Sequence, residues 1–366
     1  MPLVLVDLLS YTGTKGGMET YTRELYRSIG DQPGEFTFVG LASREGFELD
    51  TSWFPGEVVP SGISGENRVQ WALGELFAVG RWASRLGADL IHGPATLGPA
   101  RTRIPVVLTM HDMLYFSHPE FMSTPLYTEP VKWMEKVASR NASWVVTDSE
   151  TSASEIVKYL DYPRERLQVV LLAGASDPTR AEHHERRGDL ILAMGNRRPH
   201  KNFDNLVRAL ALVDPAIRPT LTITGSRGDD PLRPLVAELS LQQWVDLRSW
   251  VSQEELEELY GTASALAVPS YAEGFGLPIL EAMGAGLPVM ISDLPVFREV
   301  AADSAVYFDP ADPVSIAAAI TRIVSEPGLR EKLERVGAEQ AALFSWSATA
   351  AQTLDAFRSA LANPRR

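Results

Sequence analysis

Short apolar runs of strand length alternate with longer segments of helical periodicity along most of the chain. The runs of the first half lie at 2–9, 35–42, 88–94, 105–112, 143–150 and 167–172. Those of the second half lie at 190–195, 220–225, 245–251, 265–270, 288–292 and 305–309. Most of the segments between them repeat apolar residues every three or four positions, the period of a helix with one buried face. This alternation predicts parallel sheets with helices on both faces, a doubly wound α/β fold.

The alternation is interrupted near the middle by a polar, charged segment, "AGASDPTRAEHHERRGD", at 173–189. Such segments connect domains, so we predict one domain at 1–175, a linker at 176–188 and a second domain at 189–345. Both domains are expected to be Rossmann-like. Ligands of open α/β sheets bind beyond the carboxyl ends of the strands, which predicts a site in a central cleft that the domains face.

The composition is that of an acidic globular protein without thiols. The 366 residues have a formal net charge of −13 and include no cysteine. The charge disfavours nucleic acid as a partner, and the lack of thiols excludes disulfides and suits a cytoplasmic compartment. The N-terminal run meets Asp7 after a few apolar residues, so it is expected to be a strand and not a signal peptide. No apolar run reaches the ~18 residues that span a bilayer.

A cluster of basic residues follows the run at 190–195 and precedes a helix. The cluster contains Arg197, Arg198, His200 and Lys201. Cations at the positive end of a helix cost about 0.3–1 kcal/mol each unless an anion binds there. We therefore interpret the cluster as a diphosphate site.

Two glutamates, Glu273 and Glu281, belong to the loop and helix that follow the run at 265–270. Between them, backbone amides that can approach a ligand closely are offered by Gly274, Phe275, Gly276 and Leu277. A carboxylate on the first turn of the helix, where we expect Glu281, can accept two hydrogen bonds from a vicinal diol such as that of ribose. An acid/base pair of a glycoside hydrolase is the alternative, and both remain open on these residues alone.

Two loops of the first domain add weaker candidates. Gly16 and Gly17 precede a helix that begins at about Met18, so their amides could meet an anion, although a simple tight turn explains them equally well. His111 stands just past a buried strand, at the predicted ligand edge of the sheet. His183 and His184, in the linker, lack the spaced partners of a metal site.

Taken together, these segments resemble the retaining GT-B glycosyltransferases that carry an E-x7-E motif. "EGFGLPILEAMGAGLPV" is similar to that motif, and "GGMETYTRELYRSI", "VVLTMHDMLYFSHPEF", "GNRRPHKN", "VSQEELEELYGTASALAVPS" and "FSWSATAAQTL" match further segments in the family's order. The resemblance extends over nearly the whole chain. It implies a GT-B fold in which the last helix, at about 346–366, returns to the first domain.

The resemblance also implies roles for the residues of the second domain. Glu281 would hold the ribose of the donor, while Glu273 and the amides of 274–277 would contact the transferred sugar and its phosphate. Gly225 and the stretch 249–251 would lie near the base.

The diphosphate would be neutralised without a metal by Lys201 and by Arg197 or Arg198. The family's "G-R" pair is here Gly195-Asn196, which leaves the choice between the two arginines open.

In the first domain, Gly16 and Gly17 would lie under the phosphate and the acceptor, and His111 would touch the sugar. The implied reaction is transfer of a sugar from a GDP- or UDP-sugar, with GDP-mannose as one candidate, without a protein nucleophile. The acceptor would be a glycan, a lipid-linked intermediate or a small molecule. A glycoside hydrolase or phosphorylase-type enzyme and a non-catalytic sugar-nucleotide-binding protein are the rival hypotheses.

The acceptor side carries one more pattern, at 66–86 and 132–140. Aromatic residues there alternate with arginines and lysines. This is compatible with peripheral contact to a membrane surface, although core packing beneath a solvated face explains it at least as well. The sequence does not indicate the oligomeric state.

Overall fold

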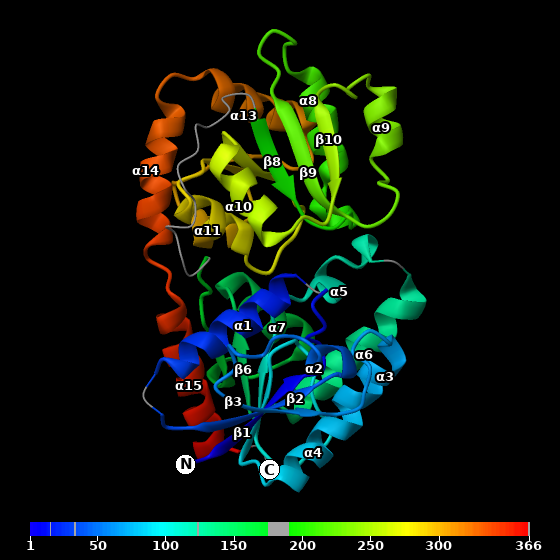
Figure 1. The fold of residues 1–366 in the computed structure, drawn as a ribbon, viewed down its shortest axis with the longest axis vertical. Coiled ribbons are helices and arrows are strands. Elements are labelled where there is room, and N and C mark those ends of the chain that lie inside the picture. Colours follow the sequence, from blue (N-terminus) through cyan, green and yellow to red (C-terminus); the bar gives the residue numbers. More distant parts are fainter. Residues whose placement is uncertain (15, 33, 123, 175–189, 365–366) are drawn as a thin grey trace. The chain divides into compact units, whose positions relative to one another are not determined.

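A computed structural model describes residues 1–14, 16–32, 34–122, 124–174 and 190–364. The chain divides into two compact units, of which unit 1 contains Met1–Leu172 and Ser345–Arg366 and unit 2 contains Ala173–Phe344 (Figure 1). Unit 2 thus begins at Ala173, before the predicted boundary at 189. The predicted linker at 176–188, with His183 and His184, lies outside the described residues.

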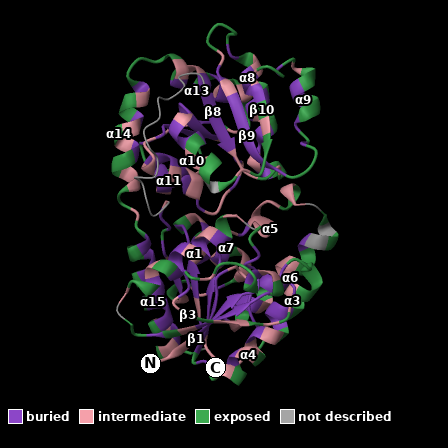
Figure 2. Cartoon of the chain, in the orientation of Figure 1, coloured by how far each residue is buried: buried purple, intermediate pink, exposed green. Residues whose placement is uncertain are grey.

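Unit 1 is built on a parallel sheet of seven strands in the order β3-β2-β1-β4-β5-β6-β7. The strands are β1 (Leu3–Leu8), β2 (Thr37–Ala42), β3 (Gly56–Pro60), β4 (Leu90–Gly93), β5 (Val106–Thr109), β6 (Trp144–Thr147) and β7 (Leu167–Val169). Six of them coincide with predicted runs, and the edge strand β3 was not predicted. The inner strands β4 and β5 are buried throughout, as expected where helices cover both faces of a parallel sheet (Figure 2).

The helices of unit 1 follow the strands in alternation. They are α1 (Gly17–Gly30), α2 (Arg44–Phe47), α3 (Arg68–Leu73), the π-helix η1 (Gly74–Ala78), α4 (Val79–Leu86), α5 (Leu114–Ser117), η2 (Pro119–Phe121), α6 (Pro125–Asn141), α7 (Glu150–Leu160), η3 (Arg164–Arg166) and α15 (Trp346–Ala362). The C-terminal helix α15 belongs to this unit, and Thr349 in its first turn donates a hydrogen bond of 2.7 Å to the carbonyl of Leu171, just past β7.

Unit 2 has a six-stranded parallel sheet in the order β10-β9-β8-β11-β12-β13. Its strands are β8 (Leu190–Met194), β9 (Thr220–Ser226), β10 (Val245–Ser249), β11 (Ala265–Val268), β12 (Val289–Ser292) and β13 (Val306–Phe308). Its helices are η5 (Pro199–Lys201), α8 (Phe203–Leu212), α9 (Arg233–Glu238), α10 (Gln253–Thr262), α11 (Leu277–Gly284), α12 (Pro295–Ala301), α13 (Pro313–Ser325) and α14 (Leu329–Ala341). The doubly wound α/β prediction is confirmed for both units.

The strand order decides where ligands can bind. It reverses between β1 and β4 in unit 1 and between β8 and β11 in unit 2. At such switch points the loops leaving neighbouring strands diverge to opposite faces and open a crevice at the carboxyl edge. The loops after β8 and β11 are those that carry Lys201 and Glu273.

Candidate functional site

The switch point of unit 2 brings Lys201 and Glu273 into direct contact. The Nζ atom of Lys201 lies 2.7 Å from Oε1 of Glu273, and Ser270 donates to the same oxygen at 2.6 Å. Burial raises the pKa of Glu273, but Lys201 and Ser270 outweigh it, so that the pKa lies below its ordinary value. Glu273 is therefore an anion at neutral pH and is poorly suited to donate a proton.

Arg197, predicted to face the diphosphate, instead binds inside unit 2. Its Nε and Nη2 donate to the carboxylate of Asp230, and its remaining N–H groups donate to carbonyls at 2.8–3.0 Å, those of Gly195, Ile223 and Thr224. A guanidinium has five N–H donors, and all five are engaged. The side chains of Arg197 and Asp230 are only 7% and 3% exposed. The phosphate role predicted for Arg197 would require breaking this buried ion pair or one of these hydrogen bonds.

Arg198 is exposed, and its guanidinium has no hydrogen bond or ion pair to any residue within the described part of the chain. It precedes the 3-10 turn η5 that carries Lys201. Of the two arginines that the sequence left open, Arg198 is the one whose donors are available.

Glu281 lies in α11 and is held by Tyr260 of α10. The hydroxyl of Tyr260 lies 3.0 Å from Oε2 of Glu281. Burial, and then the charge of Glu281, raise the pKa of Tyr260 well above its ordinary value, so the hydroxyl keeps its proton and donates. Because α11 begins at Leu277, one residue earlier than expected, Glu281 lies at the start of its second turn and not on its first. The earlier start is set by Gly276, whose φ of 112° makes it the N-cap.

The loop between the two glutamates can contact a ligand mainly through its backbone amides and less through its side chains. A Cβ at Gly276 would lie 3.0 Å from carbon atoms of Ile279 and Phe297, so only glycine fits without a shift. The ring of Phe275 is 4% exposed and packs edge-on against Phe344, so only its amide is left for a ligand. Gly225 has φ of 93°, and a Cβ there would lie 2.7 Å from the carbonyl oxygen of Gly195. Close approach of β8 and β9 therefore explains Gly225 whether or not a base binds nearby.

In unit 1, Gly16 is the N-cap of α1 with φ of 62°, and Gly17 is the first helical residue. The loop before them is ordered by Glu19, whose Oε1 accepts hydrogen bonds from the amides of Thr12 at 2.6 Å and Thr14 at 3.3 Å. An acidic side chain from the helix thus occupies amides of this loop. If this loop binds an anion as predicted, the amides at the start of α1 are the ones that would bind it.

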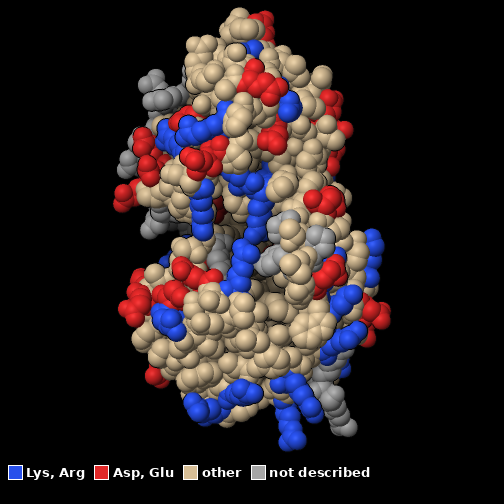
Figure 3. All heavy atoms as spheres, turned by 90° about the vertical axis from the view of Figure 1, so that its right-hand side faces the viewer, with Lys and Arg blue, Asp and Glu red and all other residues tan. Residues whose placement is uncertain are grey.

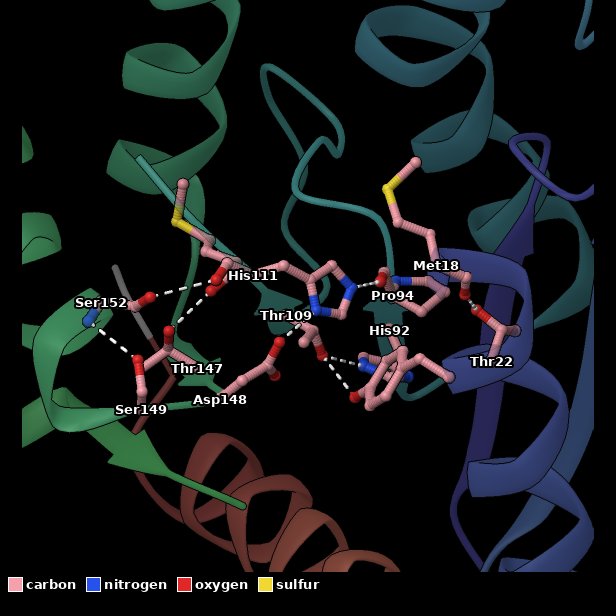
Figure 4. Close-up of polar contacts among 12 residues, drawn as sticks. Met18, Thr22, His92, Pro94, Thr109, His111, Thr147, Asp148, Ser149 and Ser152 are labelled. Carbon is pink, nitrogen blue, oxygen red and sulfur yellow. Dashed lines mark hydrogen bonds and ion pairs between the residues drawn. The ribbon is translucent and has the colours of Figure 1, made fainter. Parts of the chain in front are cut away.

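His111, just past β5, is enclosed by three elements of unit 1 (Figure 4). Its Nδ1 lies 2.6 Å from Oδ2 of Asp148, and its Nε2 lies 2.9 Å from the carbonyl oxygen of Pro94. The ring of Tyr21 meets it edge-on with centroids 4.7 Å apart. Burial alone lowers the pKa of His111, but Asp148 and the Pro94 carbonyl outweigh it, so that the pKa lies above its ordinary value.

A buried hydrogen-bond network stands behind Tyr21. The hydroxyl of Tyr21 lies 2.9 Å from Oγ1 of Thr109, which is 3.0 Å from Nε2 of His92, and the other nitrogen of His92 binds the hydroxyl of Tyr26. Burial, and then the charge of His111, lower the pKa of His92 to about 3. His92 is therefore a neutral core residue that orders its surroundings.

Sequence reasoning missed the partners of the site residues, namely Asp148, Asp230, Tyr260 and Tyr21. Asp148 directly follows β6, so the rule that selected His111, a polar residue just past a buried strand, would also have selected it. Tyr260 carries no such signal, because an aromatic residue on a helix is usually part of the core.

The described residues contain no cluster of three or more His, Asp or Glu side chains arranged to hold a metal ion. None of the helices in the described ranges is long and apolar enough to cross a membrane.

Comparison with known proteins places the chain in a family. Residues 177–340 match "Glycosyl transferases group 1" and residues 15–173 match "Glycosyltransferase Family 4". O-antigen chain mannosyltransferase B of Escherichia coli is 33% identical over 295 residues, which cover 76% of each chain.

Solved structures agree in fold. Sucrose-phosphate synthase from Thermosynechococcus elongatus has a TM-score of 0.76 at 20% identity over 99% of both chains. Anabaena HepE in complex with UDP-glucose has a TM-score of 0.73 at 18% identity, over 98% of this chain and all of that one. The consecutive family matches and the relative at 33% identity show that the chain belongs to the group 1 glycosyltransferases and has their two-domain GT-B fold.

Proposed function

We propose that the protein transfers a sugar from a nucleotide-diphosphate sugar to an acceptor hydroxyl with retention of anomeric configuration. The observation that carries the proposal is the group of charged side chains at the switch point of unit 2. Arg198 and Lys201 offer cations for a diphosphate, and Glu281 offers a carboxylate for the ribose diol. These side chains lie at the carboxyl edge of one sheet, which is where nucleotides bind in such folds.

Lys201 is suited to act on the leaving phosphate. An ammonium group has three N–H donors, and among the described residues the Lys201 ammonium contacts Glu273 alone. The other donors can meet phosphate oxygens, and Arg198 adds a second cation. We propose that these two side chains neutralise the diphosphate in place of a divalent metal ion.

The proposed chemistry uses no protein nucleophile. The bond between the anomeric carbon and the phosphate oxygen breaks, and a bond from the acceptor oxygen to the same face of that carbon forms. The acceptor proton passes to the leaving phosphate, whose developing charge Lys201 and Arg198 stabilise. A hydrolase pair needs one ionised and one protonated carboxyl. Glu273 is ionised, and the Tyr260 hydroxyl, which keeps its proton, donates to Glu281 and favours the carboxylate form of that residue too, which supports transfer over hydrolysis.

The donor is proposed to be a GDP- or UDP-sugar. A mannosyltransferase among the relatives favours GDP-mannose as the donor. A structural neighbour was solved in complex with UDP-glucose, so UDP-sugars are a second candidate class of donor. A thermal-shift panel of GDP and UDP sugars, followed by a transfer assay, tests both. We expect stabilisation by one base and little by the other.

The residue roles are tested with Glu281→Ala and Lys201→Ala, using Glu238→Ala on the exposed surface of α9 as the control. We expect donor affinity to fall about 10- to 100-fold in the first two, as for loss of a charge-assisted hydrogen bond, and to stay unchanged in the control. Equal affinity in all three would show the site to be wrongly placed. Cleavage of an aryl glycoside without nucleotide would support the hydrolase, and tight binding without transfer would support a binding protein.

We also propose that the acceptor is presented at an anionic lipid surface. Val69, Leu73 and Phe77, on α3 and η1, are 68%, 53% and 48% exposed, and Trp133 of α6 is 55% exposed. The two segments share one apolar cluster, to which Leu76 and Met134 both belong. The basic residues of the same segments are Arg68, Arg81, Arg85, Lys132, Lys136 and Arg140, of which Lys132 is paired with Glu129.

In a chain of net charge −13, such a concentration of cations around exposed apolar side chains complements an anionic membrane. Figure 3 shows this side of unit 1, with Lys and Arg side chains gathered along its lower border.

Flotation with vesicles tests the lipid proposal. We expect binding to phosphatidylglycerol-containing vesicles and not to pure phosphatidylcholine, and loss of binding in the double variant Leu73→Ser/Phe77→Ser. Leu343→Ser, which changes a leucine of unit 2 that is even more exposed than Leu73 and Phe77, is the control. Binding that ignores lipid charge, or that survives the double variant, contradicts the proposal. If the wild type forms a dimer and the double variant is monomeric while Leu343→Ser still dimerises, this surface binds a second copy of the chain and not a membrane.

A further inference from the structure

Both ring nitrogens of His111 face atoms that accept hydrogen bonds. The Pro94 carbonyl oxygen lies 2.9 Å from Nε2, and the Asp148 carboxylate lies 2.6 Å from Nδ1. A carbonyl oxygen can only accept, so Nε2 must carry a hydrogen. The Pro94 carbonyl therefore favours those states of the ring in which Nε2 carries a hydrogen.

The remaining proton is shared between Nδ1 and Asp148. If the carboxyl is ionised, Nδ1 carries the hydrogen and the ring is an imidazolium. If the carboxyl is protonated, it donates to Nδ1, and the ring is the neutral Nε2–H tautomer. In both states Nε2–H is a donor, and neither nitrogen has a lone pair available to a substrate proton.

The charges around the ring act in the same direction. Asp148 approaches from the end of β6, and Asp112 adjoins the ring in the chain, both raising the pKa of His111. Tyr21 of α1 covers the ring with its edge and is fixed by Thr109, and His92 of β4 is neutral and adds no opposing charge. The second oxygen of Asp148, Oδ1, is buried and has no hydrogen-bond partner in the described residues. Within the described residues, the Asp148 carboxylate therefore contacts His111 alone through hydrogen bonds.

We propose that Asp148 is a positioning residue that keeps the Nε2–H of His111 in place, so that His111 serves the substrate as a hydrogen-bond donor and never as a base. This rests on the proposed function only for the identity of the substrate oxygen, a hydroxyl or phosphate oxygen that replaces the Pro94 carbonyl as acceptor. The acceptor proton then goes to the leaving phosphate, as in the reaction above, and not to this histidine.

Nitrogen-15 NMR of histidine-labelled protein tests the protonation state without substrate. We expect the Nε2 of His111 in the wild type to remain protonated from pH 6 to 8. In Asp148→Asn the ring should lose its second proton within that range, because the carboxylate that holds it is gone. Asp112→Asn, which removes a carboxylate that raises the pKa of His111 less than Asp148 does, is the matched control and should shift the titration of the ring less than Asp148→Asn. An unprotonated Nε2 in the wild type at any pH in this range overturns the proposal, even if Asp148→Asn does not fold.

Kinetics give the second readout. Asp148→Asn should lower kcat/KM for transfer by about 10- to 100-fold, the effect of one charge-assisted hydrogen bond, and should make it fall with rising pH where the wild type is flat. A pH profile identical to wild type would reduce Asp148 to a packing role and overturn the proposal. Absence of any transfer, with NMR as expected, would overturn the proposed function and leave the protonation of His111 established.

Discussion

Two neighbouring arginines, Arg197 and Arg198, should give opposite phenotypes when each is changed to alanine. Removing Arg197 strips Asp230 of its ion pair in a site where the side chains are 7% and 3% exposed. Breaking a buried pair by removing one partner costs about 3–5 kcal/mol, and the carbonyls that Arg197 binds lose donors as well. We expect Arg197→Ala to destabilise unit 2 by at least that amount.

Arg198→Ala should leave stability within about 0.5 kcal/mol of wild type, as for other surface substitutions. If Arg198 binds the donor diphosphate, its loss removes a charge-assisted bond of about 1.5–3 kcal/mol. That corresponds to a 10- to 100-fold rise in Kd. Arg208→Ala, on the exposed face of the next helix, removes the same charge nearby and is the control.

Urea unfolding followed by hydrogen exchange in β9 measures the first effect, because the Arg197 bonds end on that strand. Calorimetric titration of the donor measures the second. Arg197→Ala should lower the free energy of unfolding of unit 2, and Arg198→Ala should lower the affinity for the donor without changing that free energy. The reasoning is refuted if Arg197→Ala is as stable as wild type, or if Arg198→Ala binds donor no worse than Arg208→Ala.

The Arg197 pair also predicts a pH dependence. Burial raises the pKa of Asp230, but hydrogen bonds from Arg197 and the Leu232 amide outweigh it and lower the pKa below its ordinary value. A lowered folded-state pKa contributes stability above the unfolded pKa that is lost as pH falls through the folded one. Unit 2 should therefore lose stability on acidification below about pH 4, and Arg197→Ala should lose less.

Three further changes test other parts of the structure. Tyr260→Phe should weaken donor binding about tenfold, because it removes the bond that orients Glu281, and titration calorimetry with the donor measures this. Gly225→Ala should destabilise unit 2 by about 1–3 kcal/mol in urea unfolding, because its φ is 93° and its Cβ would meet the Gly195 carbonyl at 2.7 Å. Burial chiefly raises the pKa of Glu135 from 4.5 to about 8, so its contribution to stability is present below pH 4.5 and is lost as pH rises toward 8. Glu135→Gln should abolish that loss, which unfolding curves between pH 5 and 8 would show.

The fold was predictable because parallel strands covered on both faces leave long apolar runs, which stand out against amphipathic helices. The edge strand β3 was not predicted, and there is a physical reason for this. Its sequence, "GEVVP", is bounded by glycine and proline and has no fully buried residue, and proline is tolerated only at such edges. The start of α11 was misplaced because Gly276, with its positive φ, caps the helix before Pro278.

The sequence predicted which loops carry the candidate residues, and it did not predict the contacts that these residues make. The rule that ligands meet the carboxyl ends of strands selected the loops that carry Lys201, Glu273 and His111. It could not choose between Arg197 and Arg198, which have the same chemistry and adjoin in sequence. The choice depends on which side chain turns toward Asp230, a residue 33 positions away that nothing in the local pattern connects to them.

Three acids of the two units share one arrangement, in which each accepts a hydrogen bond from a donor of its own unit. Glu273 binds Lys201, Glu281 binds Tyr260, and Asp148 binds His111. Groups held this way already have their orientation before substrate arrives, so little reorganisation is needed as charge develops in the transition state. If that is their purpose, replacing the donor partner should reproduce, at smaller size, the loss caused by replacing the acid. A partner that served folding alone would change stability and leave kcat/KM unchanged. The Tyr260→Phe and Asp148→Asn variants therefore separate preorganisation from packing in each unit independently.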